Sequence, residues 1–229
     1  MRRSIAVVCL GLVVVATPAA AQEQSLNLFV GGFTPRGLDG RGTHDVLFQN
    51  LDFLTFDIKD FNGPTVGAEW LFGLGHNIEA GVGTGFYQRT SPAIHTRLTH
   101  KNGDEIEQDL KLRVVPFTAT LRVLPLGRNG AIRPYFGAGV AVLSWRYSET
   151  GEFVDFDHNN EIFRDNFISK GSNAAPLVLG GATFPLGNVG LGGEIRWQGG
   201  RGNLSSDWPA GTKIDLGGMT YLFMVNLRF

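Results

Sequence analysis

The sequence predicts an all-β protein, an eight-stranded antiparallel transmembrane β-barrel built as an up-and-down meander. Three observations lead to this prediction: apolar residues recur at every second position over eight segments, the connections between segments alternate between long and short, and an export signal comes first. A period of two indicates a strand, because successive side chains point to opposite faces. The last segment, TYLFMVNLRF, shows this best, since it alternates up to its final Phe229 where soluble domains are usually frayed.

The N-terminal residues have the pattern of a secretory signal peptide. A positive start, MRR, precedes an apolar run of 12 residues from Ile5 to Ala16, and the three alanines that end at Ala21 fit a signal peptidase site. The run is too short for a transmembrane helix. We therefore divide the chain into a cleaved signal peptide, residues 1–21, and an outer-membrane barrel domain, residues 22–229.

Composition narrows the possible functions. The only cysteine, Cys9, lies in the signal peptide, so the mature chain has no disulfide, no cysteine-based metal site and no thiol nucleophile. Without the two arginines of the signal peptide, 18 basic residues stand against 21 acidic ones, a net charge of −3 that offers no basic surface for nucleic acid. The 32 glycines favour strands whose backbones approach closely.

The eight strands are expected in the following order along the chain: Ser25–Thr34, Pro64–Leu74, Asn77–Arg89, Leu110–Leu124, Arg133–Ser148, Ala174–Pro185, Asn188–Gly199 and Lys213–Phe229. Long loops follow the odd-numbered strands: Pro35–Gly63, Thr90–Asp109, Glu149–Asn173 and Gly200–Thr212. Short turns follow the second, fourth and sixth strands: Gly75-His76, Pro125–Ile132 and Leu186-Gly187. Short turns at one end and long loops at the other are typical of outer-membrane barrels.

The two faces of each strand differ in polarity. Apolar side chains share one face in the second strand (Val66, Ala68, Trp70, Phe72), the third (Ile78, Ala80, Val82, Phe86), the fourth (Val115, Phe117, Ala119, Leu121, Val123), the seventh (Val189, Leu191, Ile195, Trp197) and the eighth (Tyr221, Phe223, Val225, Leu227, Phe229). The opposite faces carry glycines and charges. In lipid, a small barrel turns the apolar faces outward and packs the charges inside.

Six charged residues are therefore expected inside the barrel: Glu69, Glu79, Arg122, Glu194, Arg196 and Arg228. The interior of an eight-stranded barrel is just wide enough to be filled by side chains. These charges could plug the lumen as ion pairs, or they could line a polar path for ions or a small solute. Buried charges must be paired in either case, so their presence does not distinguish the two.

The first long loop, HDVLFQNLDFLTFDIKDF, holds more Phe and Leu than a solvated loop needs. It could pack as a small cap above the membrane on extended strands. It could instead form a hydrophobic mouth that admits an apolar ligand, and the candidate residues are Phe48, Leu51, Phe53 and Phe56.

The sequence lacks the residues that define one catalytic motif and one metal-binding motif. The five histidines, His44, His76, His95, His100 and His158, are expected in loops or turns, and none has the His-x-Ser pair of outer-membrane lipid deacylases. Asp155, Asp157 and Asn159 are spaced like the start of a calcium loop, but Asn160 and Asn166 replace its glycine and closing glutamate. We expect no enzyme activity, no metal and no cofactor.

Two segments resemble known proteins. YLFMVNLRF resembles the C-terminal signature of Gram-negative outer-membrane proteins, which implies that the barrel assembly machinery recognises Tyr221, Phe223, Val225, Leu227 and Phe229. RPYFGAGVAV, a short PLGN turn and GLGGEIRW are similar to the eight-stranded OmpA/OmpW-like outer-membrane β-barrel superfamily. The resemblance spans the mature chain and identifies an architecture rather than an activity.

The leading hypothesis is a monomeric, non-enzymatic barrel in the outer membrane of a Gram-negative bacterium, in contact with lipids and lipopolysaccharide. Its role would be structural or interactive, with a largely plugged lumen and exposed extracellular loops. The alternative is a narrow, OmpW-like channel for small apolar molecules or ions, and a lipid-modifying enzyme comes third. A channel would conduct, an enzyme would change the mass of lipid A, and a structural barrel would do neither.

Overall fold

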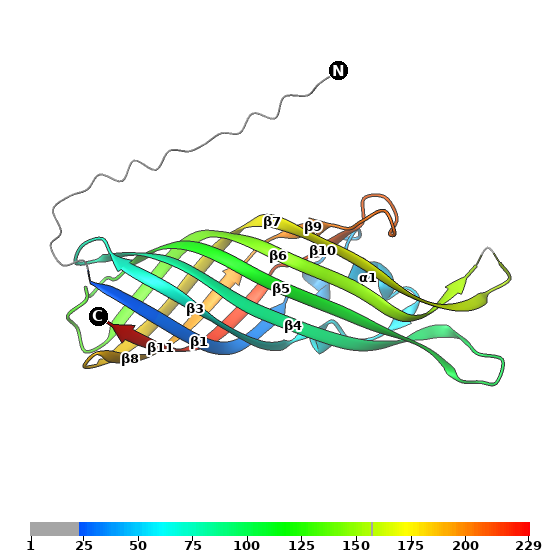
Figure 1. Cartoon of the computed structure of the whole chain (residues 1–229), viewed down its shortest axis with the longest axis horizontal. Helices are drawn as coiled ribbons and strands as arrows, with labels where there is room; N and C mark the ends of the chain where they lie inside the picture. The colour runs from blue at the N-terminus through cyan, green and yellow to red at the C-terminus, as the bar shows by residue number, and fades with distance from the viewer. Residues whose placement is uncertain (1–22, 157) are drawn as a thin grey trace, which may run out of the picture.

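The computed structural model describes residues 23–156 and 158–229, and the predicted signal peptide lies outside them. Eight long antiparallel strands close into a ring (Figure 1): β1 (Gln24–Pro35), β3 (Gly63–Gly73), β4 (Ile78–Thr99), β5 (Glu105–Val123), β6 (Arg133–Asp155), β7 (Glu161–Leu186), β8 (Val189–Gln198) and β11 (Gly218–Arg228). Each pairs with the next along the chain, and β11 pairs with β1. The predicted up-and-down barrel is confirmed. Among the described residues, no helix has the length and hydropathy to cross a membrane.

The barrel has two unlike ends. Short turns join β3 to β4, β5 to β6 and β7 to β8 at one end, here called the turn end, where the C-terminus also lies (Figure 1). In the tightest of these turns Gly187 has a φ of 69°, which glycine adopts at little cost. The opposite, or loop, end carries the four other connections. The predicted alternation of short and long connections holds only in part: the first and last connections at the loop end are long, but those between β4 and β5 and between β6 and β7 are short.

Strands β4 to β7 are much longer than predicted, with 22, 19, 23 and 26 residues. The loops predicted at Thr90–Asp109 and Glu149–Asn173 are mostly strand, and they form two hairpins that project from the loop end. Turn-like residues such as Pro92 lie inside these strands. Pairing with neighbouring strands overrides their local preference.

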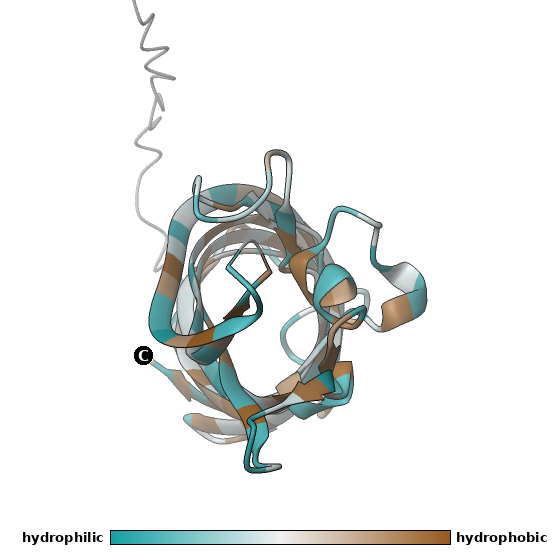
Figure 2. Cartoon of the chain, turned by 90° about the vertical axis from the view of Figure 1, so that its right-hand side faces the viewer, coloured by the Kyte–Doolittle hydropathy of each residue, from teal (hydrophilic) through white to brown (hydrophobic). Residues whose placement is uncertain are grey.

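The first connection folds into a compact unit at the loop end. It contains η1 (Leu38–Gly40), α1 (Val46–Asn50), β2 (Leu54–Thr55) and η2 (Ile58–Phe61), which gather at one side of the rim in Figure 2. Asp45 caps α1 by accepting hydrogen bonds from the backbone amides of Leu47 (3.1 Å) and Phe48 (3.3 Å). Such capping satisfies amides that have no partner within the helix.

The last predicted strand is broken. Residues Lys213–Asp215 form β10, which pairs with β9 (Arg201–Asn203), and the barrel strand β11 begins only at Gly218. The break has a local cause, since the side chain of Asp215 accepts a hydrogen bond from the amide of Gly217 at 2.8 Å. The carbonyl of Gly217 accepts one from Arg36 at 2.9 Å.

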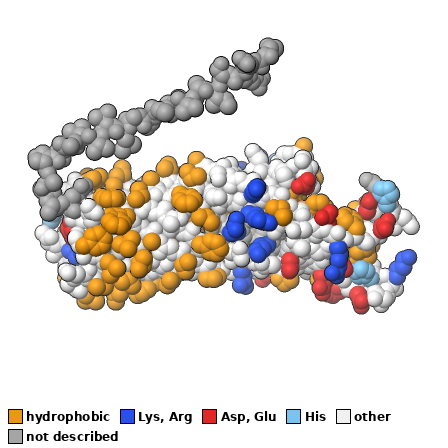
Figure 3. All heavy atoms as spheres, in the orientation of Figure 1, with side chains coloured by type: hydrophobic (Ala, Val, Ile, Leu, Met, Phe, Trp, Pro, Cys, Tyr) orange, Lys and Arg blue, Asp and Glu red, His pale blue; other side chains and the backbone are white. Residues whose placement is uncertain are grey.

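A belt of exposed apolar side chains surrounds the half of the barrel nearer the turn end (Figure 3). Its members include Leu28, Val30, Val66, Val82, Phe86, Phe117, Leu121, Phe136, Val140, Val142, Val178, Ile195, Tyr221 and Phe223. A continuous apolar surface of this kind is typical of a barrel that lies in lipid. Nearer the loop end, outward positions of β5, β6 and β7 carry basic side chains instead.

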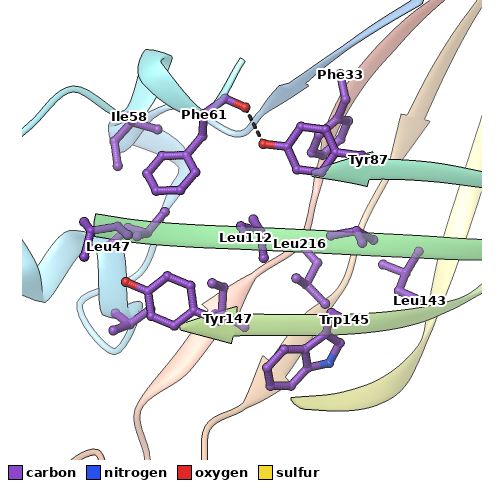
Figure 4. Close-up of a cluster of buried hydrophobic side chains, with 14 of the residues drawn as sticks. Phe33, Leu47, Ile58, Phe61, Tyr87, Leu112, Leu143, Trp145, Tyr147 and Leu216 are labelled. Carbon is purple, nitrogen blue, oxygen red and sulfur yellow. Dashed lines mark hydrogen bonds between the residues drawn. The ribbon is translucent and has the colours of Figure 1, made fainter. Parts of the chain in front are cut away.

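The interior has the opposite arrangement. Inside the belt it holds buried charges beside a smaller apolar cluster that includes Phe29, Leu222 and Met224, and above the belt it holds a larger apolar core. This loop-end core, shown in part in Figure 4, comprises Phe33, Val46, Leu47, Leu54, Ile58, Phe61, Tyr87, Ala93, Leu110, Leu112, Val114, Ala141, Leu143, Trp145, Tyr147, Ala175, Ile214 and Leu216. In the half nearer the turn end, here called the membrane half, apolar side chains therefore lie mainly on the outside of the barrel. In the half nearer the loop end they lie mainly in the interior.

Candidate functional site

Four charged side chains meet inside the half of the barrel that carries the apolar belt, and we call them the charge cluster. Glu69 comes from β3, Arg122 from β5, and Glu194 and Arg196 from β8, and all four are buried. Arg122 Nη2 lies 2.9 Å from Glu194 Oε2, and Arg196 Nη2 lies 2.7 Å from Glu69 Oε2. Arg122 also pairs with Glu69, and Arg196 pairs with Glu194. Each charge thus has two partners of opposite sign.

Neutral groups complete the coordination of the charge cluster. Thr120 Oγ1 donates to Glu69 Oε1 at 2.9 Å, and the hydroxyl of Tyr135 donates to Glu194 Oε2 at 2.8 Å. The guanidinium of Arg122 lies 4.6 Å from the centre of the Tyr135 ring. Buried charges are tolerated when they are paired and hydrogen-bonded in this way.

Glycine makes room for these side chains. Gly81 faces the lumen from β4, and a Cβ atom built on it would lie 2.6 Å from Thr120 Oγ1 and 2.7 Å from Glu69 Oε1. Any larger residue there would displace the hydrogen bond between those two side chains. The high glycine content inside the barrel is thus explained in part by the volume of the charges opposite.

The other two predicted interior charges, Glu79 and Arg228, lie apart from the cluster at the turn end. Glu79 Oε1 is 3.5 Å from Arg128 Nε, and Arg228 Nε donates to Asn226 Oδ1 at 3.2 Å. Glu23 is 3.8 Å from both Arg128 and Arg133. The sequence did not predict a role for Glu23, Arg128 and Arg133, because each lies at a strand end or in a turn, where alternation gives no signal.

The four residues that the sequence proposes for an apolar mouth differ in exposure. Phe48 and Leu51 are half-buried, Phe53 is 39% exposed, and Phe56 packs edge-on against Phe61 with ring centres 6.3 Å apart. Other apolar residues of the same loop point inward and belong to the loop-end core: Val46, Leu47, Leu54, Ile58 and Phe61. The backbone carbonyl of Phe61 accepts a hydrogen bond from Tyr87 of the barrel wall (Figure 4).

A buried carboxylate fastens the first and last connections to the wall. Glu149 Oε1, on β6, accepts hydrogen bonds from Asn50 Nδ2 (2.8 Å), the hydroxyl of Tyr147 (2.8 Å) and Trp208 Nε1 (3.4 Å). Asn50 belongs to α1, and Trp208 belongs to the connection between β9 and β10. Sequence reasoning missed this contact because Glu149 was placed at the start of a loop.

The histidines are dispersed. His95 was predicted in a loop but lies in β4, where it pairs with Leu54, because β4 extends to Thr99. His44, His76, His100 and His158 lie in turns or connections, as predicted. Within the described residues, no group of three or more His, Cys, Asp or Glu side chains could hold a metal ion. Asp157 of the calcium-like pattern lies outside the described residues.

The two projecting hairpins are joined by Glu152. Its carboxylate oxygens lie 2.8 Å from His100 Nε2, at the end of β4, and 2.9 Å from Arg164 Nη2 on β7. Hydrogen bonds from His100 and Arg164 hold the pKa of Glu152 below its ordinary value. Glu105 and Glu107 line the hollow beside this contact.

Acid should open this contact. A carboxyl group with a lowered pKa contributes stability above its unfolded pKa, about 4.3, and loses it as the pH falls through the folded value. We therefore expect the hairpin tips to be close at neutral pH and to separate below about pH 4. Electron spin resonance between labels at Asn102 and Asn160 would measure this. Glu152→Gln should separate the tips at neutral pH, and a wild-type distance unchanged down to strong acid would contradict the expectation.

Comparison with known proteins identifies the fold. No family model matches the sequence, and no curated protein is similar to it in sequence. Among solved structures, neisserial surface protein A is 11% identical with a TM-score of 0.50, covering 90% of this chain and 97% of that one. The outer membrane protein OprG of Pseudomonas aeruginosa is 12% identical with a TM-score of 0.51, covering 91% and 96%. The resemblance predicted from YLFMVNLRF and RPYFGAGVAV is confirmed at the level of fold: the chain is a small eight-stranded barrel of the outer-membrane type.

Proposed function

We propose that this chain is a non-enzymatic outer-membrane protein whose lumen is closed and whose function is carried by its extracellular surface. The observation that carries the proposal is the pair of barriers in series, the charge cluster in the membrane half and the loop-end core above it. Either barrier would obstruct a solute. Because the two are chemically different, the apolar loop-end core would be unfavourable for an ion, and the charge cluster would be unfavourable for an apolar molecule.

The apolar belt and the barrel topology support placement in the outer membrane. In barrels of this kind the short turns face the periplasm and the longer connections face the exterior. The turn end would then be periplasmic, and the two projecting hairpins would be extracellular. Charged and apolar side chains both reach the surface there, including Phe156 and Arg164. Such a surface suits contact with another molecule more than transport.

The small size of the cavity beside the charge cluster also supports a closed lumen. The cavity between the charge cluster and the turn end has a volume of about 30 Å³ and is lined by Glu79, Arg122, Tyr135 and Arg228 among others. A water molecule needs roughly 10–15 Å³ by this measure, so the cavity has room for about two or three. A sugar or an amino acid would not fit without moving the lining side chains.

Uptake and lipid analysis together test this proposal. Proteoliposomes that contain the refolded mature protein should take up neither a small sugar nor an apolar solute such as indole faster than empty vesicles. Expression in a Gram-negative host should leave the mass of lipid A unchanged. Uptake would instead establish the narrow channel that the sequence left as an alternative, and a new lipid A mass would establish an enzyme.

The terminal Phe229 is proposed as part of the assembly signal. Its side chain is 65% exposed, its ring centre lies 5.4 Å from that of Trp70, and its amide donates to the carbonyl of Gln24 at 3.2 Å. Deleting Phe229 removes the ring contact with Trp70 and the hydrogen bond to Gln24, but it removes no buried side chain. The assembled fold should therefore persist. We expect a lower yield of assembled protein in the outer membrane, measured by the heat-dependent gel shift.

A matched variant controls for the loss of an exposed apolar group. Leu126 lies in a turn at the same end of the barrel and is also 65% exposed. Leu126→Ala should leave the yield unchanged. An outer-membrane yield of the Phe229 deletion equal to that of wild type would show that Phe229 does not serve in assembly.

A further inference from the structure

A row of basic side chains crosses three neighbouring strands on the outside of the barrel. Arg113 on β5 is directly opposite Arg146 on β6, and Arg146 is directly opposite Lys170 on β7. Lys111 lies two residues beyond Arg113 on the same face. All four are exposed, and Lys and Arg side chains are seen together just past the end of the apolar belt in Figure 3. We call these four residues the basic row.

The described residues form no direct ion pair with this row. Like charges directly opposite one another destabilise a sheet. In the part of the chain that the structure describes, none of the four side chains forms an ion pair or a hydrogen bond. Other exposed bases do have acidic partners, as Arg164 has in Glu152 and Arg201 has in Asp215. The row therefore concentrates positive charge that an external anion could neutralise.

The level of the row along the barrel indicates where that anion would be. On β5 the outward apolar face ends at Val115, two residues from Arg113, and on β6 it ends at Val142, four residues from Arg146. The row therefore lies roughly 7–13 Å beyond the belt at about 3.3 Å per residue, and less along the tilted barrel axis. That level corresponds to the lipid headgroups rather than to open solvent. Beyond the row, the outward face of β5 turns acidic at Asp109.

We propose that the basic row binds the phosphate groups of outer-leaflet lipid, the phosphorylated glycolipid of the Gram-negative surface. This inference rests on the proposed orientation, which places the row above the outer leaflet. Arginine presents paired N–H donors that match phosphate oxygens, and both arginines and lysines are favoured beside anionic headgroups. The acidic residues above the row would repel phosphate and so fix the depth at which the lipid is held.

Titration of the refolded mature protein in neutral detergent tests the proposal. The probes are lipid A with its phosphates, lipid A without them, and inorganic phosphate. The variant Arg113→Gln/Arg146→Gln/Lys170→Gln removes three charges from the row, and its affinity for phosphorylated lipid A should fall about a hundredfold. The control Lys59→Gln/Arg97→Gln/Lys101→Gln removes three exposed charges elsewhere at the loop end and should bind like wild type.

Several results would overturn the proposal. The first is equal affinity of the triple variant and wild type for phosphorylated lipid A. The second is equal affinity of wild type for the two forms of lipid A. The third is full competition by inorganic phosphate at the same concentration as the lipid, which would indicate a site for the free anion. If the triple variant does not fold, the single variant Arg146→Gln tests the proposal instead. This change relieves the repulsion of Arg146 by Arg113 and Lys170, so the variant should be at least as heat-stable as wild type in detergent. Phosphorylated lipid A should nevertheless stabilise the variant less than it stabilises wild type.

Failure of the proposed function can be told apart from failure of this inference. A barrel that did not insert into lipid vesicles would contradict its placement in the membrane, whatever the titration gave. A barrel that inserted with a closed lumen but did not distinguish the two forms of lipid A would contradict only the phosphate site.

Discussion

Replacing Glu69 with alanine is expected to lower the free energy of unfolding by about 3–5 kcal/mol, because it leaves buried cations without a partner. Glu69 is the acid shared by Arg122 and Arg196, and without it two guanidinium groups would have only Glu194. Lipid surrounds this part of the barrel, so water could reach the uncompensated charge only through the lumen. Unfolding in urea, followed by tryptophan fluorescence in lipid vesicles, would measure the loss.

Two further variants separate charge pairing from other effects at this site. Glu79→Ala removes an acid that also faces the lumen but lies near the turn end, 3.5 Å from Arg128, and it should cost less than Glu69→Ala because Arg128 keeps Glu23 and the carbonyl of Ile78 as partners. Glu69→Leu combined with Arg122→Met removes one acid and one base and keeps the Glu194–Arg196 pair, so it should be more stable than Glu69→Ala. A Glu69→Ala variant no less stable than Glu79→Ala would contradict the role given to the charge cluster.

Replacing Phe61 with alanine should destabilise the loop end by about 3–5 kcal/mol, the usual cost of deleting a fully buried aromatic side chain. Phe61 is 0% exposed within the loop-end core, and its backbone is held by Tyr87. The loss should be local, because the membrane half is stabilised by lipid and by the charge cluster. The first connection, residues 36–62, should become sensitive to protease while the strands in lipid stay protected.

Phe53 provides the matched control for this prediction. It lies on the same connection and is a phenylalanine too, but it is 39% exposed. Phe53→Ala should change stability by no more than about 0.5 kcal/mol and leave the protease pattern unchanged. If protease cleaved the first connection equally fast in both variants, that connection would be an open loop and not a compact unit packed on the loop-end core.

The sequence was sufficient to predict the barrel because alternation specifies strands and the spacing of turns specifies their order. It was not sufficient to predict where the strands end at the loop end. On β5 the apolar side chains sit at Leu110, Leu112 and Val114, and then at Phe117 and Leu121. The first set has even numbers and faces the interior, while the second has odd numbers and faces lipid. This shift of phase is the one local signal of a strand that leaves the membrane, and a search for unbroken alternation misses it.

The sequence predicted which charged residues face the lumen, but it did not predict which of them contact one another. Glu69, Arg122, Glu194 and Arg196 each occupy a lumen-facing position, which alternation predicts. Their meeting depends on the stagger of three strands around the barrel, which a single strand does not encode. The contacts of Glu149 with Asn50 and Trp208 join residues 99 and 59 positions apart, and no periodic pattern connects such residues.

The proposed function depends on a closed lumen, and single-channel recording measures whether ions pass through it. The refolded mature protein would be inserted into a planar bilayer, with its folding confirmed by a heat-dependent gel shift. A closed lumen predicts no steady openings from wild type. Steady openings whose size changes in an Arg196→Gln variant would contradict it, because ions would then be passing through the charge cluster.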